Sequence, residues 1–191
     1  MLKYRPFEMH CHTRHSDGTF LVPQLIESVA AYGYAGLALT DHNAVTGLLE
    51  VTEELQRKNN CLVLPGIEWT TFYGHLLVIG CDRFVDWRFV TPDTIDEALQ
   101  EIRAAGGIAG VAHPCEVGSP LMCGCNWEFR VKRWDLMDYV EIWSGPDPHA
   151  SAKNGLAMPW YDALLNQGYH LAISAGRDWH GPDKPGQIPL L

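Results

Sequence analysis

The sequence lacks several features that would assign a protein to a broad class. No apolar run is long enough to cross a bilayer, and Lys3, Arg5 and Glu8 interrupt the start, where a signal peptide would be apolar. Basic residues are few, with 14 Lys and Arg against 23 Asp and Glu and a formal net charge of −9. These absences argue against a membrane protein and against an extended basic surface for long nucleic acid.

The sequence also lacks a disulfide framework. Its six cysteines are scattered through a chain of 191 residues without the paired spacing of a small secreted scaffold. Cys61 and Cys81 lie in apolar, strand-like runs, and Cys123-Gly124-Cys125 has no second cysteine pair to complete a soft-metal site. We therefore expect a reducing, cytoplasmic location.

What the sequence does contain is enough apolar material for one core. With 191 residues, of which 47% are hydrophobic, it suits a single domain over 1–191. Apolar stripes at helical spacing alternate with short apolar runs that are typical of buried strands. Helices are predicted at about 22–33, 45–58, 92–105 and 154–168, and strands at 8–12, 36–40, 61–67, 75–80, 108–112, 138–143 and 170–175.

This alternation predicts a mainly parallel α/β fold, in which about seven strands favour a barrel-like closure over an open sheet. One link is too short for a parallel crossover: Tyr73-Gly74 makes an antiparallel pair of the strands on either side. Glu68 and His75 should then share one rim. In a barrel or an open sheet, functional groups collect at the carboxyl ends of the strands.

Side chains that bind metals stand at that rim. The spacing of His10 and His12 makes their side chains project from one face of the opening strand, whereas the side chain of Cys11 projects from the other. Asp17 follows after a turn. Later strand ends carry more residues of these types: His42, Glu68, His113, Asp178 and His180. Each one alone has an ordinary explanation as a turn, loop or cap residue. Their repetition at successive strand ends, with His75 on the same rim, predicts a metal cluster.

Taken together, these motifs resemble those of the PHP (polymerase and histidinol phosphatase) family. The resemblance runs from about residue 8 to 182, and its motifs are His10-x-His12, Ser16-Asp17-Gly18, Thr40-Asp41-His42, Gly66-x-Glu68, Gly74-His75, Ala112-His113-Pro114 and Asp178-x-His180. The segments 66–70, 74–76 and 140–143 look closest to the branch that contains carbaryl-hydrolase-like metallohydrolases.

The resemblance implies a distorted (β/α)7 TIM-like barrel that holds two or three divalent ions. Motif position divides the ligands into three sets: His10, His12, Glu68 and Asp178 for the first ion, Glu68, His75 and His113 for the second, and Asp17, His42 and His180 for the third. Members of the family use manganese, iron or zinc, and mixed nitrogen and oxygen ligands fit all three metals.

Such a cluster predicts a phosphoesterase. Divalent ions outweigh the ligand carboxylates, so the site would attract phosphate even on an acidic chain. A metal-bridged hydroxide would attack the phosphoester in line, without a covalent enzyme intermediate. The expected partner is a small phosphorylated metabolite or nucleotide; we expect no membrane and no stable nucleic-acid complex.

Residues beside the ligand motifs are further candidates. Arg14 and Arg177 flank such motifs, so either could bind non-bridging phosphate oxygens; the alternative is a surface arginine or one paired with an acid. Asp41 precedes His42 and could orient it. Glu141 either faces the cavity or is a buried structural acid.

Other interpretations remain open. His149 could protonate a leaving group, although a solvated loop histidine is the more ordinary reading. Hydrolysis of a carbamate, amide or carboxylic ester is the main alternative function, followed by a nuclease and a non-catalytic metal-bound domain. The chain ends soon after His180, so the barrel is expected to be incomplete there, closed by 188–191, or covered by a neighbour in a homo-oligomer.

Overall fold

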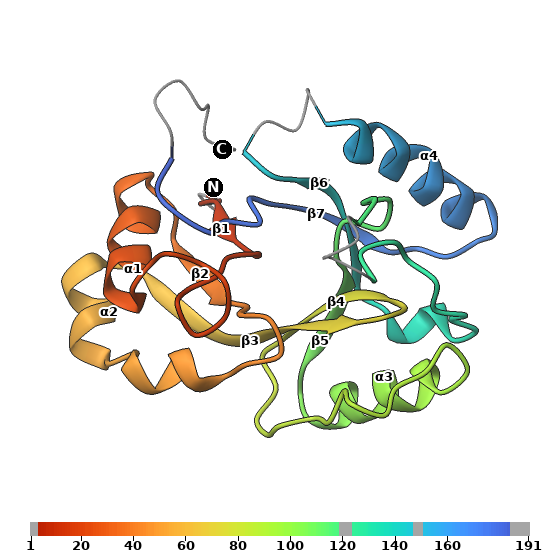
Figure 1. The fold of residues 1–191 in the computed structure, drawn as a ribbon, viewed down its shortest axis with the longest axis horizontal. Helices are drawn as coiled ribbons and strands as arrows, with labels where there is room; N and C mark the ends of the chain where they lie inside the picture. Colours follow the sequence, from red (N-terminus) through yellow and green to blue (C-terminus); the bar gives the residue numbers. More distant parts are fainter. Residues whose placement is uncertain (1–3, 119–123, 147–150, 184–191) are drawn as a thin grey trace.

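Seven strands, each paired with its neighbour in the sequence, form a curled sheet that is a nearly closed barrel (Figure 1). The computed structural model describes residues 4–118, 124–146 and 151–183. The strands are β1 (Phe7–Glu8), β2 (Gly36–Leu39), β3 (Leu62–Thr71), β4 (Gly74–Ile79), β5 (Ile108–Val111), β6 (Tyr139–Ser144) and β7 (Ala172–Gly176). The predicted barrel-like α/β architecture is confirmed.

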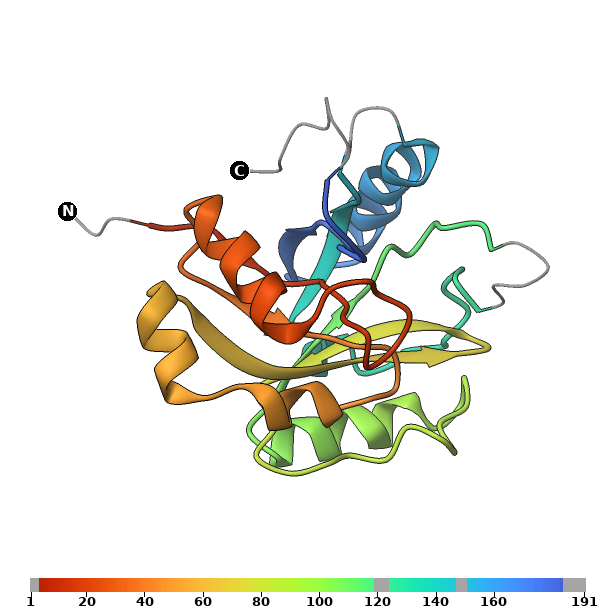
Figure 2. The same ribbon diagram turned by 60° about the vertical axis from the view of Figure 1, so that its left-hand side comes forward.

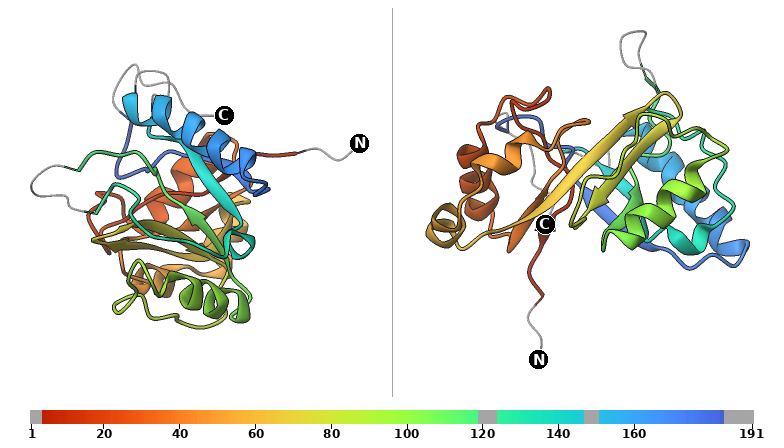
Figure 3. Two further views of the ribbon diagram at one scale, coloured as in Figure 1. Left: turned by 90° about the vertical axis from the view of Figure 1, so that its right-hand side faces the viewer. Right: turned by 90° about the horizontal axis from the view of Figure 1, so that it is seen from below.

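One strand, β4, runs against the others. It pairs antiparallel with β3 and with β5, whereas the remaining neighbours are parallel. A two-residue turn between Thr71 and Gly74 leaves no room for a crossover helix, as the short link predicted. The resulting β3–β4 ribbon is the long yellow pair in Figure 3. Thr70 pairs with His75, which brings His75 and Glu68 to one rim.

The first and last strands of the barrel are joined through the segments that follow them. In the described part of the chain β1 and β7 form no ladder, but Cys11 and Trp179 make an isolated parallel bridge. His12 N donates to Trp179 O at 2.9 Å, and Trp179 N donates to His10 O at 3.1 Å. Below this bridge, a cleft of about 420 Å³ remains between β1 and β7. An incomplete barrel is thus seen only in the missing ladder between β1 and β7 among the described residues. Residues 188–191 lie outside those residues, and a homo-oligomer stays a prediction.

Helices cover the outside of the barrel on both flanks. Figures 1 and 2 show α1 (Val22–Ala31) and α2 (Glu53–Asn59) on one flank, and α3 (Ile95–Ala104) and α4 (Ala152–Asn166) on the other. The apolar stripe predicted for α1 is buried. None of the helices among the described residues combines the length and the apolar character needed to span a bilayer.

The single helix predicted at 45–58 is wrong. The structure has a short 3₁₀ helix, η1 (Thr46–Glu50), then two extended residues, Val51 and Thr52, and only then α2. Thr52 explains the break, because its side chain accepts a hydrogen bond from Leu55 N at 3.1 Å and starts a new helix. The apolar spacing on both sides concealed this cap.

Two predicted boundaries also shift. Helix α3 begins at Ile95 rather than at 92, because Thr94 Oγ1 accepts a hydrogen bond from Thr91 N at 2.9 Å and closes a turn before the helix. The opening strand ends at Glu8 rather than at His12. The residues after Glu8 bond instead to the segment around Trp179, as described above.

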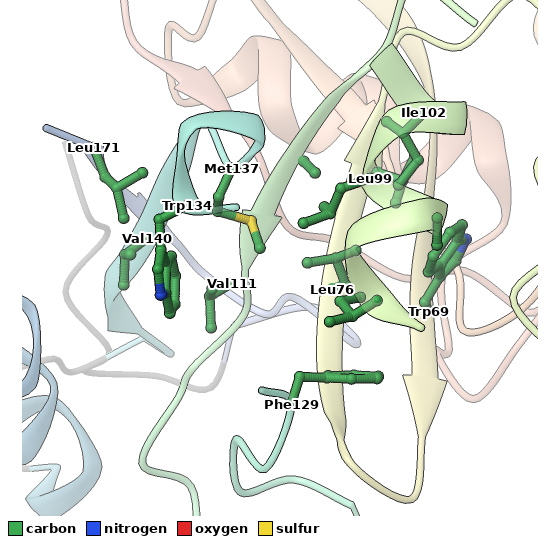
Figure 4. Packing of buried hydrophobic residues seen from close by; sticks show 14 of the residues in the cluster. Trp69, Leu76, Leu99, Ile102, Val111, Phe129, Trp134, Met137, Val140 and Leu171 are labelled. Atoms are coloured by element: carbon green, nitrogen blue, oxygen red, sulfur yellow. The ribbon is translucent and has the colours of Figure 1, made fainter. Parts of the chain in front are cut away.

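Two main apolar clusters hold the elements in place. The larger lies between β3–β6 and α3 and includes Trp69, Leu76, Leu99 and Trp134 (Figure 4). The smaller joins α1 and β2 and includes Cys11, whose thiol donates to Ala38 O at 3.1 Å. Cys11 therefore faces the core, and the histidines on either side of it face the barrel interior, as the alternation predicted. Burial of the large side chains stabilises this frame.

Candidate metal centre

All nine predicted ligands gather in one cluster, which extends from the buried His10 and Glu68 to the exposed Asp17. Each has a ring nitrogen or a carboxylate oxygen within 3.6 Å of another member of the set. The members are His10, His12, Asp17, His42, Glu68, His75, His113, Asp178 and His180. Residues separated by more than 160 positions, such as His12 and Asp178, come within 3.1 Å because the two ends of the sheet meet there.

Glu68 is the centre of the cluster. It is fully buried, and five imidazoles lie 2.9–3.4 Å from its two oxygens. These rings belong to His10, His12, His42, His75 and His113. Burial alone would raise the pKa of Glu68, but the imidazoles, His10 foremost, hold it well below its usual range. Glu68 is therefore an ionised carboxylate inside a ring of nitrogen donors.

The donor atoms form overlapping groups in which all atoms lie within 4.8 Å of one another. These groups are His10, His12, Glu68 and Asp178; His12, Asp17, His42 and His180; His42, Glu68 and His75; and His113, Glu116 and Asp178. The first equals the set implied for the first ion, and the second contains the set implied for the third. The set implied for the second ion is divided between the last two groups, although Glu68 contacts both its histidines.

Unsatisfied atoms in the cluster fit divalent cations. Among the described residues, His10 Nε2, Glu68 Oε2 and His75 Nε2 are buried without a hydrogen-bond partner. His10 Nε2 and Glu68 Oε2 are only 3.1 Å apart, yet they are not aligned to bond to each other, so both face a shared space. Unpaired buried polar atoms are costly. A divalent ion with mixed nitrogen and oxygen ligands would satisfy them.

A buried acid on β6 braces two of the ligands. Glu141 Oε1 lies 3.0 Å from His10 Nδ1, and Glu141 Oε2 accepts a hydrogen bond from His113 N at 3.0 Å. His113 has a backbone φ of 24°, which a residue with a side chain rarely adopts. Of the two alternatives for Glu141, the structure thus shows the buried, hydrogen-bonded acid. Glu141 thus fixes the ring of His10 and the backbone of His113.

Gly176 leaves room for Glu141, and we predict that Gly176→Ala disturbs both stability and metal binding. The added Cβ would meet Glu141 Oε1 at 2.3 Å and His10 Cβ at 2.6 Å. Overpacking of this kind costs about 1–3 kcal/mol. Misplacing a carboxylate that orients a metal-binding histidine weakens metal affinity by about 10–100-fold. Urea denaturation and metal titration would measure the two effects.

Gly155→Ala is the matched control, because nothing lies within 4 Å of a Cβ at this position in α4. It should leave metal affinity unchanged and raise stability slightly, by up to about 1 kcal/mol. Equal stability and equal metal affinity in the two variants would show that the contact with Glu141 affects neither property.

Asp41 organises the loop between two ligand motifs. It is buried, and its two oxygens accept hydrogen bonds of 2.7 Å from Thr13 N, Thr13 Oγ1 and Ser16 Oγ. These bonds fix the turn that separates His12 from Asp17. The described hydrogen bonds of its side chain therefore go to this loop and not to the ring of His42.

The two arginines lie differently from each other. Arg177 is buried, its guanidinium stacks on the rings of Trp179 and Tyr32, and it pairs with Asp183. Arg14 is exposed, and its Nε donates to Thr19 O at 3.1 Å. In the described ranges, neither side chain has a hydrogen bond or ion pair to the nine ligands. His149 lies outside the described residues.

Sequence reasoning missed three charged residues beside the ligands. Glu8 Oε1 accepts hydrogen bonds from the backbone N–H groups of His10 and Arg177, at 3.0 and 3.1 Å, and burial raises its pKa to about 7. Glu116 lies beside His113, and Lys153 pairs with Glu116. The only sequence signal was the spacing of Glu116 three residues after His113, since Lys153 comes from a distant helix.

The outermost donor group predicts a pH-dependent uptake of metal. His180 Nε2 lies 3.1 Å from Asp17 Oδ1. Partial burial would lower the pKa of His180, but Asp17 raises it to about 9, and the hydrogen bond from His180 lowers the pKa of Asp17 to about 2. The stability from this pair is fully present between pH 3.8 and 6.5, the ordinary pKa values of the two groups. It is lost as the pH rises through about 9, where His180 loses its proton, or falls through about 2, where Asp17 gains one.

Since a metal binds only the neutral imidazole, loading this group at pH 7 should release protons. Calorimetric titration of metal-free protein in two buffers with different ionisation enthalpies would measure the release. It should fall as the pH approaches 9, and His180→Gln should release fewer protons than the wild type at pH 7. A proton release that is identical in the two proteins would contradict the prediction.

Comparisons with known proteins agree with this geometry. A model of the PHP domain matches residues 8–110, more than half of the chain. A 3',5'-nucleoside bisphosphate phosphatase of Chromobacterium violaceum is 34% identical over 79 residues, which cover 39% of this chain and 27% of that protein. The matched segment is thus about a quarter of that phosphatase.

Two solved structures share the fold. One is a two-domain protein from Bacteroides vulgatus that contains a predicted PHP-like metal-dependent phosphoesterase, with a TM-score of 0.68, 18% identity, and coverage of 93% of this chain and 52% of that chain. The other, from Bifidobacterium adolescentis, is described as a metal-dependent phosphoesterase and has a TM-score of 0.66, 17% identity, and coverage of 98% and 93%. This chain therefore spans about half of the first structure and nearly all of the second.

Proposed function

This chain belongs to the PHP domain family, and from that premise we propose that it is a metal-dependent phosphoesterase acting on a small phosphorylated metabolite or nucleotide. The observation that carries the proposal is the convergence of five imidazoles on the buried, ionised carboxylate of Glu68. Such a set of donors has no evident structural purpose, because it leaves polar atoms buried and unpaired.

The nine ligands are the residues that we propose to hold the ions. Divalent ions bound there would activate a water molecule as the nucleophile and stabilise the attacking and leaving oxygens of a phosphoester. They would also give the site a local positive charge, which attracts phosphate although the chain carries a net charge of −9. The protein's own part is to fix the ligands before substrate arrives.

Several residues do this fixing. Glu141 holds the ring of His10 with Nε2 toward Glu68, and Asp41 holds the loop that ends at Asp17. We propose that Arg177, stacked on Trp179, anchors the segment that bears Asp178 and His180. Arg14 is the exposed arginine of the pair and the one that we propose to meet the substrate phosphate.

Hydrolysis of a carbamate, amide or carboxylic ester stays a prediction, because it rests on the sequence patterns of the carbaryl-hydrolase-like branch. The same cluster would serve a carbonyl substrate, since metal ions polarise carbonyl and phosphoryl oxygens alike. The two functions differ in the substrate that is turned over.

A panel of chromogenic substrates tests the proposal. Protein purified without chelator and supplied with manganese would be given p-nitrophenyl phosphate, bis-p-nitrophenyl phosphate, p-nitrophenyl acetate and nucleoside monophosphates. We expect the phosphoesters to be hydrolysed, and the activity to disappear in a Glu68→Gln preparation made in parallel, which controls for contaminating phosphatases. Turnover of the carboxylic ester alone would support the alternative, and equal rates in both preparations would refute both functions.

A further inference from the structure

Two charged residues outside the predicted ligand set form a pair next to His113, with Glu116 beside the ring and Lys153 beside Glu116. One oxygen of Glu116, Oε2, lies 3.3 Å from His113 Nδ1 and 2.8 Å from Lys153 Nζ. Glu116 follows β5, whereas Lys153 lies in the first turn of α4. Their side chains are only 26% and 19% exposed, so this pair differs from the solvated ion pairs that contribute little.

The two nitrogens of His113 face different partners. Nε2 lies 3.2 Å from Glu68 Oε1, on the side of the ligand cluster. Nδ1 is buried and makes no aligned hydrogen bond among the described residues, where Glu116 is the acid beside it at 3.3 Å. A neutral imidazole carries a proton on one nitrogen and a lone pair on the other. A carboxylate beside Nδ1 favours the proton there and so leaves the Nε2 lone pair directed toward Glu68.

His10 has a related arrangement, in which the contact between ring and acid is a hydrogen bond. Its Nδ1 lies 3.0 Å from Glu141 Oε1, and its Nε2 lies 3.1 Å from Glu68 Oε2. Carboxylates in this position fix the tautomer and ring orientation of metal-binding histidines. Glu116 therefore stands to His113 as Glu141 stands to His10.

The two acids differ in what holds them. Glu141 is buried and bonds to both His10 and His113 N. Glu116 is partly exposed, and a free carboxylate at this place could turn toward solvent and would repel an approaching anion. The ammonium group of Lys153, 2.8 Å away, opposes both tendencies because it binds the carboxylate and cancels its charge.

We propose that Glu116 and Lys153 are a positioning pair for the metal centre. The carboxylate of Glu116, 3.3 Å from His113 Nδ1, favours the proton on that nitrogen, which directs Nε2 toward the ion shared with Glu68. Lys153 holds Glu116 in place and shields an anionic substrate from its charge. The proposal rests on the proposed function, because it presupposes the metal centre, and it makes the docking of α4 a part of metal affinity.

Metal titration of chelator-stripped protein, in competition with a chromogenic chelator, tests the first step. Glu116→Ala should weaken the binding of at least one ion by about 10–100-fold. Glu116→Gln keeps an oxygen acceptor and should recover most of that loss. With zinc bound, ¹⁵N spectra of the histidine side chains should show His113 protonated at Nδ1 in the wild type and altered in Glu116→Ala. Unchanged metal affinity in Glu116→Ala would overturn the proposal.

The role of Lys153 is separated by a double-variant cycle on KM. Lys153→Met should raise KM for a phosphoester several-fold, because the charge of Glu116 is then uncompensated. Combining it with Glu116→Gln should restore KM, while metal affinity stays close to that of Glu116→Gln alone. If Lys153→Met raises KM equally in the presence and absence of Glu116, Lys153 contacts the substrate directly and the positioning role is refuted. Lys58→Met, which removes the exposed partner of Glu27, is the control and should change neither KM nor metal affinity.

Failure of this proposal is distinguishable from failure of the proposed function. The wild type could bind metal, Glu116→Ala could bind it more weakly, and the wild type could still hydrolyse no phosphoester. That combination would support the positioning of His113 and refute the substrate class. A wild type that binds no divalent metal would refute both. Thermal unfolding of the metal-free variants would show whether each one is folded.

Discussion

Replacing Glu68 by glutamine is expected to abolish turnover, lowering kcat by roughly 10³-fold or more, and to reduce the bound metal. Glutamine has nearly the same shape, so the barrel should remain folded. It has no negative charge, and the five surrounding imidazoles would lose the anion that draws cations into the site. Steady-state kinetics and elemental analysis of the same preparation would measure both losses.

Glu101→Gln is the control for this experiment, because Glu101 is an exposed carboxylate on α3 away from the cluster. It should behave as the wild type in kinetics and metal content. A Glu68→Gln protein with normal metal content and a kcat within about tenfold of the wild type would show that Glu68 does not organise the centre, since tenfold corresponds to only about 1.4 kcal/mol.

Removing the metals with a chelator should abolish activity and destabilise the fold. An ion present at 100 times its dissociation constant stabilises the native state by about 2.7 kcal/mol. For a chain of 191 residues, each kcal/mol shifts Tm by about 2–4 °C, so the loss of one such ion should lower Tm by roughly 5–10 °C. Differential scanning calorimetry before and after chelation would measure the shift.

Two controls make the chelation experiment specific. Returning manganese should restore both Tm and activity, which excludes irreversible damage. The Tm of Glu68→Gln should respond less to chelator than that of the wild type, because this variant begins with less metal. Equal Tm and equal turnover with and without chelator would contradict the existence of a metal centre.

The nine residues of the cluster could be predicted because the sequence patterns that indicate them are local. His10, Cys11 and His12 alternate between two faces, and the structure places the thiol in the core and the rings in the barrel. The other ligands follow short apolar strands, whose carboxyl ends meet in a closed sheet. Neither inference needs a tertiary contact to be known in advance.

The rest of the site depends on contacts between distant segments. Lys153 meets Glu116 only because α4 docks beside the segment after β5, and nothing in the sequence near either residue indicates this. Arg177 shows a different limit. It adjoins Asp178 in the sequence, but the alternation that separates Cys11 from its histidines also turns Arg177 and Trp179 away from the ligands.

The helix boundaries illustrate how a regular pattern can mislead. The apolar positions of 45–58 continue at helical spacing across Thr52, so periodicity alone favours one helix. The hydroxyl of Thr52 caps a new helix instead. A side-chain-to-backbone bond of this kind competes with helix continuation and leaves the apolar pattern unchanged.

The central claim is that this barrel holds a multinuclear metal centre, and the most direct test is the metal content of protein purified without chelator. Elemental analysis by inductively coupled plasma mass spectrometry should find two or three divalent ions per chain, drawn from manganese, iron and zinc, and fewer in Glu68→Gln. Less than one ion per chain in folded wild-type protein that has been supplied with all three metals would contradict the account.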